Sequence, residues 1–572
     1  MSTLVSSAML STFRILLCCA VFVMQSVHAA DMSKTLHVQI KKSETGIDPA
    51  TASDFNTLSI IENIFDPMLR YDYLARPVRL QPNTLAAMPE VDAAKTGYTF
   101  HVRPGIYFSP DPAFGGKPRE LTAADYAYSF KRLNDPTVKS PWHFIFAGKI
   151  AAIEATERYT LHIRLKAPDS NFLFELAMPA TGAIAREVLD AYPPGQHPVG
   201  TGPYLMKAWL HGEKIELEAN PGFRETIFQE DSAADAAIAA ALRGKHLPLI
   251  GHIELKVVEE QQTQMLSFLS GQFDYLEQIP PPLSNMVMQD GKLKPELETK
   301  GVHLSLFTAL QTYYMWMNME DPVLGGYTPG KIALRRAIAM SYNLEEDLRV
   351  LEHGLAVAAQ SPLPPDARGY DPEYRRATRY DPQLARALLD RFGYRIRSGD
   401  TFRSTPEGKP LTLTMYTQAS TTGHLRDELW QRSLSAIGIH VVFKSETYTE
   451  IIKASRLGQV QMFETDWLGD IPDGENFLQL LYGPNREGVN YARFDLPEYN
   501  RLFEASRNLE DGAERTALYR QMERLIDFYA PWVVRIHPLS ADLRYDRVKN
   551  YQRHPVMFTA WRYLDIDNAG QK

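Results

Sequence analysis

The clearest pattern of hydrophobic and polar positions lies at residues 411–463, where short apolar runs alternate with longer amphipathic stretches. The runs at 411–416, 439–443 and 460–463 have the length and composition of buried strands. Amphipathic segments of helical length separate them. This order of strand, helix, strand, helix and strand predicts a mostly parallel sheet, because parallel neighbours need a crossover connection.

The two predicted helices of this unit have recognisable faces and ends. Gly438 is expected to end the first helix and Gly458 the second. Thr447 and Glu450 have the spacing of a capping box at the start of the second helix. The first helix is expected to bury one face, formed by Leu425, Leu429, Leu434 and Ile437.

A second pattern lies nearer the N-terminus. Alternation at 97–108 predicts a hairpin that turns at Pro104-Gly105. A helix follows, with Thr122 as its N-cap, and extends through Arg132. Strand and helix signals alternate in this way along the chain, which indicates α/β lobes.

The length of the chain sets its organisation. With 572 residues it is too long for one ordinary domain and fits roughly two to four lobes. The segment 199–204, VGTGPY, places two glycines and a proline before a strand pattern. It predicts a tight turn, which is either a crossing between lobes or an ordinary loop.

The first 29 residues have the features of a secretory signal peptide. Arg14 supplies a positive charge, residues 15–24 form an apolar run of ten, and small residues flank position 28. The alternative is a membrane anchor, but ten apolar residues are too few to span a bilayer. We therefore expect cleavage near Ala29 and a free soluble protein.

Cysteine positions and charge exclude several classes of function. Cys18 and Cys19 lie inside the apolar run, so the mature chain is expected to have no disulfide and no cysteine chemistry. Leu17 precedes Cys18 where a lipid-anchor signal needs a small residue, which argues against lipidation. The formal charge is −8 without basic runs, which gives no support for nucleic-acid binding.

Catalytic motifs are absent from the sequence. It contains no GxSxG elbow, no HExxH zinc motif and no P-loop. The 15 histidines are scattered without metal-ligand spacing. The sequence therefore favours a binding protein over an enzyme.

An acidic segment at 465–477, TDWLGDIPDGENF, follows the last apolar run of the predicted sheet and is expected to be irregular. Ligands of open α/β sheets bind beyond the carboxyl ends of strands, so Asp470 is the first candidate for ligand contact. Its carboxylate can pair with a ligand ammonium. The alternative is that Asp470 caps a turn or pairs with Arg486. Asp473, in a PDG sequence, is expected to be a turn residue.

Aromatic residues precede two polar candidates. Trp467 precedes Asp470, and the run TYYMWM at 312–317 precedes Asn318. An aromatic cavity with a few fixed polar groups is the usual form of a small-ligand site. The alternative is that these aromatic residues are core, because alternation along a strand sends about half of them inward.

Together these segments resemble the family 5 extracellular solute-binding proteins of bacterial ABC importers, the group that holds the oligopeptide- and dipeptide-binding proteins. The resemblance covers about residues 36–565. Each matching run alone is weak, but their order behind a predicted signal peptide is specific. The runs are Tyr98–Phe108 with Leu121–Arg132, Gly200–Tyr204, Arg335–Asn343, Tyr380–Tyr394 and Trp467–Phe477.

The resemblance implies an α/β fold, a periplasmic-binding-protein-like bilobal clamp with an extra third domain (type II, cluster C-like). Crossings near Thr201 and Leu310 would be its hinges. The implied division is residues 31–72, 200–309 and 541–572 for lobe I, 73–199 for the extra lobe II, and 310–540 for lobe III.

The implied function is that of a periplasmic substrate-binding protein of an ABC transporter. It would capture a short peptide in the cleft between lobes and deliver it to permease subunits in the inner membrane. We expect a monomer with no cofactor and no nucleic-acid partner. The alternatives are the same receptor fold for a glycoside, an opine, haem or a nickel chelate, or a periplasmic hydrolase or chaperone with the same clamp.

The resemblance also implies site residues. In peptide-binding members, the acid of the W-x-x-D segment that matches Trp467 to Asp470 holds the α-amine of the peptide. The neighbouring backbone, here Leu468 and Gly469, runs alongside the peptide. The segment Ile61–Phe65 matches one that lines the same cleft. The other residues expected at the ligand are Asn63, Ile64, Phe65, Asn318 and Gln418, with Arg456 as the nearest partner for a carboxylate.

Two features depart from the family pattern. Residues 223–250 form an acidic, alanine-rich stretch, longer than the expected link, that predicts a surface helix or a mobile loop. Glu464 stands where some peptide binders carry a basic residue before the tryptophan. Glu464 therefore argues against a peptide-carboxylate clamp of the kind found in relatives.

Overall fold

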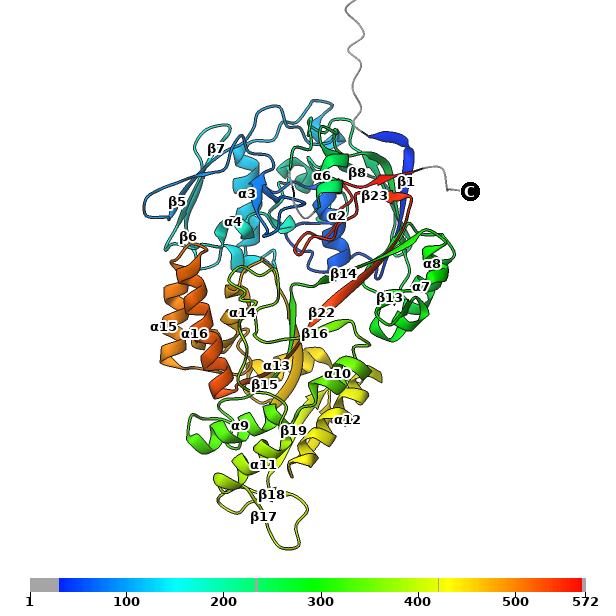
Figure 1. Cartoon of the computed structure of the whole chain (residues 1–572). Helices are drawn as coiled ribbons and strands as arrows, with labels where there is room; N and C mark the ends of the chain where they lie inside the picture. Colours follow the sequence, from blue (N-terminus) through cyan, green and yellow to red (C-terminus); the bar gives the residue numbers. More distant parts are fainter. Residues whose placement is uncertain (1–29, 231, 233–234, 420, 568–572) are drawn as a thin grey trace, which may run out of the picture.

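The computed structural model describes residues 30–230, 232, 235–419 and 421–567, so the predicted signal peptide and both cysteines lie outside the described residues. Figure 1 shows two bodies, one above the other, joined by long strands. We call residues 30–308 and 539–567 the upper body, and residues 311–537 the lower body. Within the described ranges, each helix is too short or too polar to span a bilayer.

The upper body is built on two four-stranded sheets. The strands of the first are β1 (Asp31–Ile40), β8 (Tyr204–Leu210), β9 (Lys214–Ala219) and β10 (Ile250–Val257). Their order is β1-β10-β9-β8, and only the pair of β1 and β10 is parallel. The antiparallel second sheet has the order β4-β5-β7-β6. Its strands are β4 (Glu90–Val91), β5 (Gly97–His101), β6 (Ile150–Ala155) and β7 (Thr160–Leu165).

Helices pack on these sheets. Helix α3 begins as predicted, because the Asp125 carboxylate accepts a hydrogen bond from the Thr122 N–H at 2.8 Å. Helix α6 forms in the stretch 223–250 and buries Ala239 and Leu242. The helices are α2 (Phe55–Ile64), α3 (Ala123–Leu133), α4 (Phe172–Glu175), α5 (Arg186–Ala191), α6 (Ala236–Leu242), α7 (Gln261–Leu269) and α8 (Pro295–Glu298).

The hairpin predicted at 97–108 is wrong. Strand β5 pairs with β4 and β7 instead. The turn exists, with Gly105 at φ +81°, but the chain beyond it pairs with a later segment through Tyr107 and Glu120. Alternation predicts a strand and its exposed face, but it does not identify the partner strand.

The largest sheet lies mainly in the lower body and extends into the upper one. Its strands are β11 (Tyr275–Leu276), β14 (Val302–Thr308), β15 (Gln311–Met317), β16 (Ala356–Ala358), β19 (Thr412–Thr417), β20 (His440–Ser445), β21 (Met462–Leu468) and β22 (Trp532–Tyr545). Strand β19 is parallel to both β20 and β21. This arrangement confirms the parallel sheet predicted for residues 411–463.

The helices of this unit also follow their predicted ends. Gly438 and Gly458 adopt φ values of +77° and +72°, and Thr447 with Glu450 forms the capping box. Leu425 is 46% exposed, so the predicted buried face is wrong at that position. The lower-body helices are α9 (Pro329–Ser341), α10 (Leu344–Val350), α11 (Pro382–Arg391), α12 (Thr421–Ala436), α13 (Tyr448–Arg456), α14 (Glu475–Leu478), α15 (Pro497–Arg507) and α16 (Ala513–Tyr529).

Short strand pairs lie outside these sheets. They are β2 (Leu69–Tyr71) with β3 (Leu80–Pro82), β12 (Met288–Gln289) with β13 (Lys292–Leu293), β17 (Arg395–Ile396) with β18 (Arg403–Ser404), and β23 (Val548–Lys549) with β24 (Asp565–Ile566).

Strand β22 connects the two bodies. It pairs with β15 through residues 532–536 and with β14 through residues 539–545, antiparallel in both cases. Only Ala309 and Leu310 separate β14 from β15. The bodies are therefore joined here by two adjacent antiparallel segments. The predicted boundary between residues 309 and 310 falls between β14 and β15. The lobe boundaries themselves stay a prediction.

Apolar packing is largely separate in the two bodies. One core fills the upper body and includes residues from both of its sheets. The lower sheet has a core on each face. Tyr314 and Trp316 of β15 face one core, and Met315 and Met317 face the other. Tyr314 and Trp316 are therefore core residues, and Trp316 is fully buried.

The predicted turn at 199–204 leads into β8 and packs against the end of α2. The Gly202 N–H donates to the carbonyl oxygen of Ile64 at 2.9 Å. A Cβ on Gly200 would lie 2.0 Å from that oxygen, and a Cβ on Gly202 would lie 2.5 Å from the carbonyl oxygen of Asn63. Backbone approach this close leaves room only for glycine.

We expect Gly200→Ala to destabilise the fold by about 2–4 kcal/mol, because moving a side chain cannot relieve a clash with the backbone. Gly222→Ala is the matched control, since its Cβ would come no closer than 3.5 Å to Asn220 Oδ1. Denaturant unfolding of both variants measures the difference. Equal midpoints would contradict the close packing of the turn on α2.

Candidate functional site

The acidic segment begins inside the sheet. Strand β21 continues to Leu468, so the first four residues expected to be irregular are strand, and the chain leaves the sheet only at Gly469. The Gly469 N–H donates to the carbonyl oxygen of Leu310 at 2.7 Å. A Cβ on Gly469 would lie 2.8 Å from Leu310 Cδ2 and 3.0 Å from Phe477 Cζ. The loop after β21 is thereby fixed at the crossing between the bodies.

Asn476, in α14, organises this loop. Its Oδ1 accepts hydrogen bonds from Trp467 Nε1 at 2.7 Å and from the Asp470 N–H at 3.2 Å. Its Nδ2 donates to Asp470 Oδ2 at 3.5 Å. No sequence pattern marks Asn476, because it meets both partners only through the path of the loop. One buried amide thus sets the positions of the two residues that the W-x-x-D motif singled out.

The Asp470 carboxylate has no cationic partner among the described residues. Burial raises its pKa to about 6, and the hydrogen bond from Asn476 only partly opposes this shift. Arg486, the alternative partner, lies 3.9 Å from Asp495 instead. Asp66 shows the contrast: burial would raise its pKa, but nearby Arg224 and Arg562 lower it to about 2.

The charge of Asp470 acts on Tyr71 of the upper body. Burial raises the pKa of Tyr71, and the charges of Glu62 and Asp470 raise it further. The Tyr71 hydroxyl is buried and has no hydrogen-bond partner among the described residues. Burial also raises the pKa of Glu62 to about 7, although the Thr559 N–H donates to it at 2.8 Å. This end of the interface is acidic and rich in acceptors.

A small cavity lies in the upper body beside these residues. Its volume is about 40 Å³, and Glu62, Asn63, Tyr71 and Thr559 are among its lining residues. That space is enough for a few water molecules but not for a peptide. A larger cavity of about 320 Å³ lies in the lower body and shares no lining residue with it.

The predicted upper-body residues differ in their access to a ligand. Asn63 lines the small cavity and donates to Ser59 O and Thr559 Oγ1, both at 2.8 Å. Ile64 and Phe65 are 1% and 2% exposed and belong to the upper core. Their side chains are used for packing.

The remaining predicted residues lie at two opposite ends of the strands of the lower sheet. Gln418 follows β19 and is exposed at the same end as Asp470, because β19 and β21 are parallel. Leu468 is 55% exposed there. Asn318 is buried at the other end and donates to Gly458 O at 2.9 Å. Arg456 ends α13 just before β21 begins, so the whole length of the strand, about 20 Å, separates it from the loop.

Glu464 is neutralised inside the lower body. Its carboxylate lies 2.6 Å from Arg535 and 2.9 Å from Arg426. Trp430 Nε1 donates to it at 3.0 Å. The acid that replaces a basic residue of some relatives is thus part of a buried ion cluster.

Asp473 has a second role that its PDG sequence did not indicate. It does form the predicted turn, with the Glu475 N–H donating to Oδ1 at 2.8 Å. It is also fully buried, lies 2.6 Å from Arg515 and accepts a hydrogen bond from the Tyr519 hydroxyl at 2.8 Å. The expectation of turn chemistry alone is therefore incomplete.

The two bodies are in contact next to the loop. Asn171 Nδ2 of the upper body donates to Glu475 Oε2 of the lower body at 2.9 Å. Lys95 pairs with Glu510 at 2.6 Å. Val556 packs against both the upper core and one lower core. The arrangement is a closed one, with Asp470 at the junction.

We expect Asp470→Asn to stabilise the ligand-free protein by about 1–3 kcal/mol, because it removes a half-buried charge that has no cation beside it among the described residues. The pKa of about 6 lies above the ordinary value of 3.8, so ionisation costs stability as pH rises through this range. The gain should be present at pH 7 and absent below about pH 4, where the carboxyl is protonated in folded and unfolded chains alike.

Asp473→Asn is the opposite case in the same loop. It removes the shorter ion pair of buried Arg515, at 2.6 Å, and leaves only Glu475 at 3.2 Å, so it should cost about 3–5 kcal/mol. Urea unfolding at pH 7 measures both variants. Destabilisation by Asp470→Asn would mean that its carboxylate is compensated by a group in the folded protein.

Several known proteins are similar to this chain. A family model described as "Bacterial extracellular solute-binding proteins, family 5 Middle" matches residues 79–488. The chain is 27% identical over 561 residues to Di/tripeptide-binding protein 2 of Pseudomonas aeruginosa, covering 93% of this chain and 95% of the relative. It is 23% identical over 505 residues to Heme-binding protein A of Haemophilus influenzae, covering 84% of each.

A solved structure shows the same fold. The periplasmic binding protein DppA from Helicobacter pylori, in complex with the peptide STSA, has a TM-score of 0.71 at 22% identity and covers 93% of this chain and 98% of that chain. The fold is thus the periplasmic-binding-protein-like clamp with an extra domain, as predicted. The relatives are substrate-binding proteins and not enzymes. The chain belongs to family 5 of the bacterial extracellular solute-binding proteins.

Proposed function

We propose that this protein is a periplasmic receptor that captures a short peptide between its two bodies and delivers it to the permease of an ABC importer. One observation carries the proposal: Asp470 is a half-buried carboxylate at the junction of the bodies, with no cation beside it in the described part of the chain. A peptide ammonium would supply the missing charge.

Charge compensation favours a ligand that carries an amine. An ammonium next to Asp470 forms a charge-assisted hydrogen bond, which is roughly twice as strong as a neutral one. A bound ligand without an amine leaves the carboxylate buried and unpaired, which lowers the affinity for that ligand. The site therefore selects for ligands with an amine. Asn476 and Trp467 fix the position of the carboxylate before the ligand arrives.

Strand β21 offers a free backbone edge next to Asp470. Its pairing with β15 covers the whole strand, whereas its pairing with β19 is confined to Met462 and Phe463. The stretch from Thr465 to Leu468 therefore has one side outside the sheet ladder. An extended peptide can add along such an edge as a strand, which holds its backbone whatever its side chains are.

Closure supplies the signal to the permease. A ligand that contacts Asp470 below and the Tyr71 region above favours the closed arrangement, because its contacts are complete only there. Movement would occur where β14 and β15 meet, with β22 bending beside them. A monomer is sufficient for this mechanism.

A non-peptide solute is the alternative, and one observation favours it. Neither position considered for the carboxylate end of a peptide supplies a cation, since Arg456 lies at the opposite end of β21 and Glu464 is paired internally. A relative named Heme-binding protein A also has 23% identity. Native mass spectrometry of protein purified from its host distinguishes the two, because a bound peptide and a haem differ in mass and absorbance.

We expect Asp470→Asn to weaken binding of a free di- or tripeptide by about 1–3 kcal/mol, roughly fivefold to 150-fold. Isothermal titration calorimetry measures this, with Asp495→Asn as the control at an exposed acid of the same body. N-acetylation of the peptide should cause a similar loss with the unmodified protein. Unchanged affinity in Asp470→Asn would remove Asp470 from the site.

Affinity should also depend on pH. The ammonium needs the ionised carboxylate, and the pKa of Asp470 in the empty site is about 6. The peptide amine, with an ordinary pKa near 8, stays charged at lower pH. Peptide affinity should therefore fall about tenfold between pH 7 and pH 5, where roughly one site in eleven is ionised. The Asp470→Asn variant should show no such slope, and an equal slope in both proteins would contradict the assignment.

A further inference from the structure

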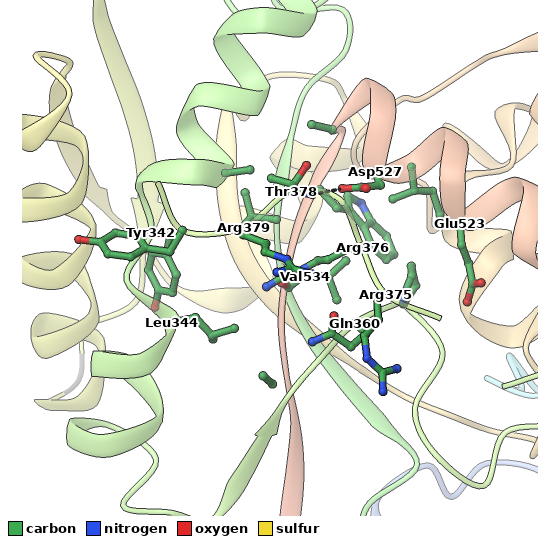
Figure 2. Close-up of a pocket in the computed structure, with 18 of the residues that line it drawn as sticks. Tyr342, Leu344, Gln360, Arg375, Arg376, Thr378, Arg379, Glu523, Asp527 and Val534 are labelled. Carbon is green, nitrogen blue, oxygen red and sulfur yellow. Dashed lines mark hydrogen bonds between the residues drawn. The ribbon is translucent and has the colours of Figure 1, made fainter. Parts of the chain in front are cut away.

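A second cavity lies in the lower body, away from the Asp470 loop. Its volume is about 320 Å³, within the range of pockets that hold small organic molecules. Its wall includes the segment 374–380, the C-terminal half of α16, the first residues of β22 and Ala339 of α9. Figure 2 shows this space, which we call the arginine cavity after Arg375, Arg376 and Arg379 in its lining.

The three arginines bring positive charge to the cavity without carboxylate partners. None of them forms an ion pair within the part of the chain that the structure describes. Arg376 is half-buried, and its Nη1 donates to the carbonyl oxygen of Val534 at 2.6 Å. The rest of its planar guanidinium remains for another acceptor. A guanidinium in this state is suited to an oxyanion, which it can hold through two parallel hydrogen bonds.

The nearby acids form no ion pair with these arginines among the described residues, although the charge of Asp527 acts on Arg376. Asp527 is occupied by the backbone of the same segment, because the Ala377 and Thr378 N–H groups donate to it at 2.7 Å and 3.3 Å. Figure 2 shows Glu523 and Asp527 projecting from α16. Burial raises the pKa of Glu523 to about 7, so a neutral carboxyl that can donate a hydrogen bond is accessible near neutral pH.

Two buried polar atoms in the lining have no hydrogen-bond partner among the residues that the structure describes. They are Thr378 Oγ1 and Glu523 Oε1, on residues that are 6% and 2% exposed. Buried polar groups are paired in the great majority of cases, so unpaired atoms at a cavity wall point to a polar guest. Trp532 and Ile526 add apolar surface on another part of the wall.

We propose that the arginine cavity binds a small carboxylate with an apolar body, such as an aryl or branched-chain acid, separately from the transported solute. Arg376 holds the carboxylate, with Arg379 adding positive charge. Thr378 and Glu523 satisfy the remaining polar groups, and the body of the ligand packs on Trp532. This site does not depend on the identity of the solute bound at Asp470.

Phenylacetate is a suitable probe, and phenylacetamide is its uncharged match in shape. Saturation-transfer difference NMR on the full protein should show saturable binding of phenylacetate, at least tenfold tighter than that of the amide. Arg376→Gln should reduce phenylacetate affinity at least tenfold. Arg456→Gln, an exposed arginine at the end of α13, is the matched control and should leave the affinity unchanged.

A second variant separates loss of charge from loss of fold. Ala339 lines the cavity from α9 and is half-buried, so Ala339→Phe should fill the space while it keeps all three arginines. Binding should be lost in this variant, with an unchanged circular dichroism spectrum. Inorganic phosphate tests whether charge alone suffices, and it should not compete with phenylacetate at equal concentration. Equal affinity for acid and amide, or unchanged binding in both Arg376→Gln and Ala339→Phe, would overturn the proposal.

Discussion

The continuous strand β22 is the constraint on which the rest of the structure depends. Its N-terminal residues pair with β15 in the lower body, and its C-terminal residues pair with β14 in the upper body. Because β14 and β15 are separated only by Ala309 and Leu310, both chain segments cross between the bodies at the same level. The loop that carries Asp470 is attached at this level through the bond from Gly469 to Leu310. The candidate site is therefore attached directly to the place where the chain crosses between the two bodies.

Charge compensation distinguishes structural acids from the candidate binding acid. Asp473 is buried against Arg515, Glu464 against Arg535 and Arg426, and Asp66 against Arg224 and Arg562. These pairs hold segments that are distant in the sequence. Asp470 is half-buried, yet among the described residues its carboxylate receives only an amide hydrogen bond. A fold that compensates these three acids with arginines and leaves Asp470 at the junction of its bodies has a place for an external cation.

Local signals made part of this structure predictable. The parallel unit at 411–463 could be read because strand length, helical period, capping residues and glycine stops are all properties of neighbouring residues. The strand pairing at 97–108 could not be predicted in this way, because the partner of strand β5 in the sheet is a distant segment, β7. Leu425 is apolar but exposed. Hydrophobic periodicity cannot distinguish such a residue from one in the core.

The candidate site was predictable only in part for the same reason. The W-x-x-D motif pointed to Trp467 and Asp470, and both lie at the junction. Asn476 was missed because its two contacts depend on the path of a loop. Arg456 was selected from its nearness in sequence, but α13 runs back along β21 and carries it to the other end of the strand.

The most direct test of the account is a crystal structure of the protein with a bound di- or tripeptide. The account predicts the peptide ammonium within about 2.7–3.2 Å of the Asp470 carboxylate, with the peptide backbone extended along Thr465 to Leu468 and both bodies closed around it. A peptide whose ammonium lies against another acid, with Asp470 facing only protein atoms or solvent, would contradict it.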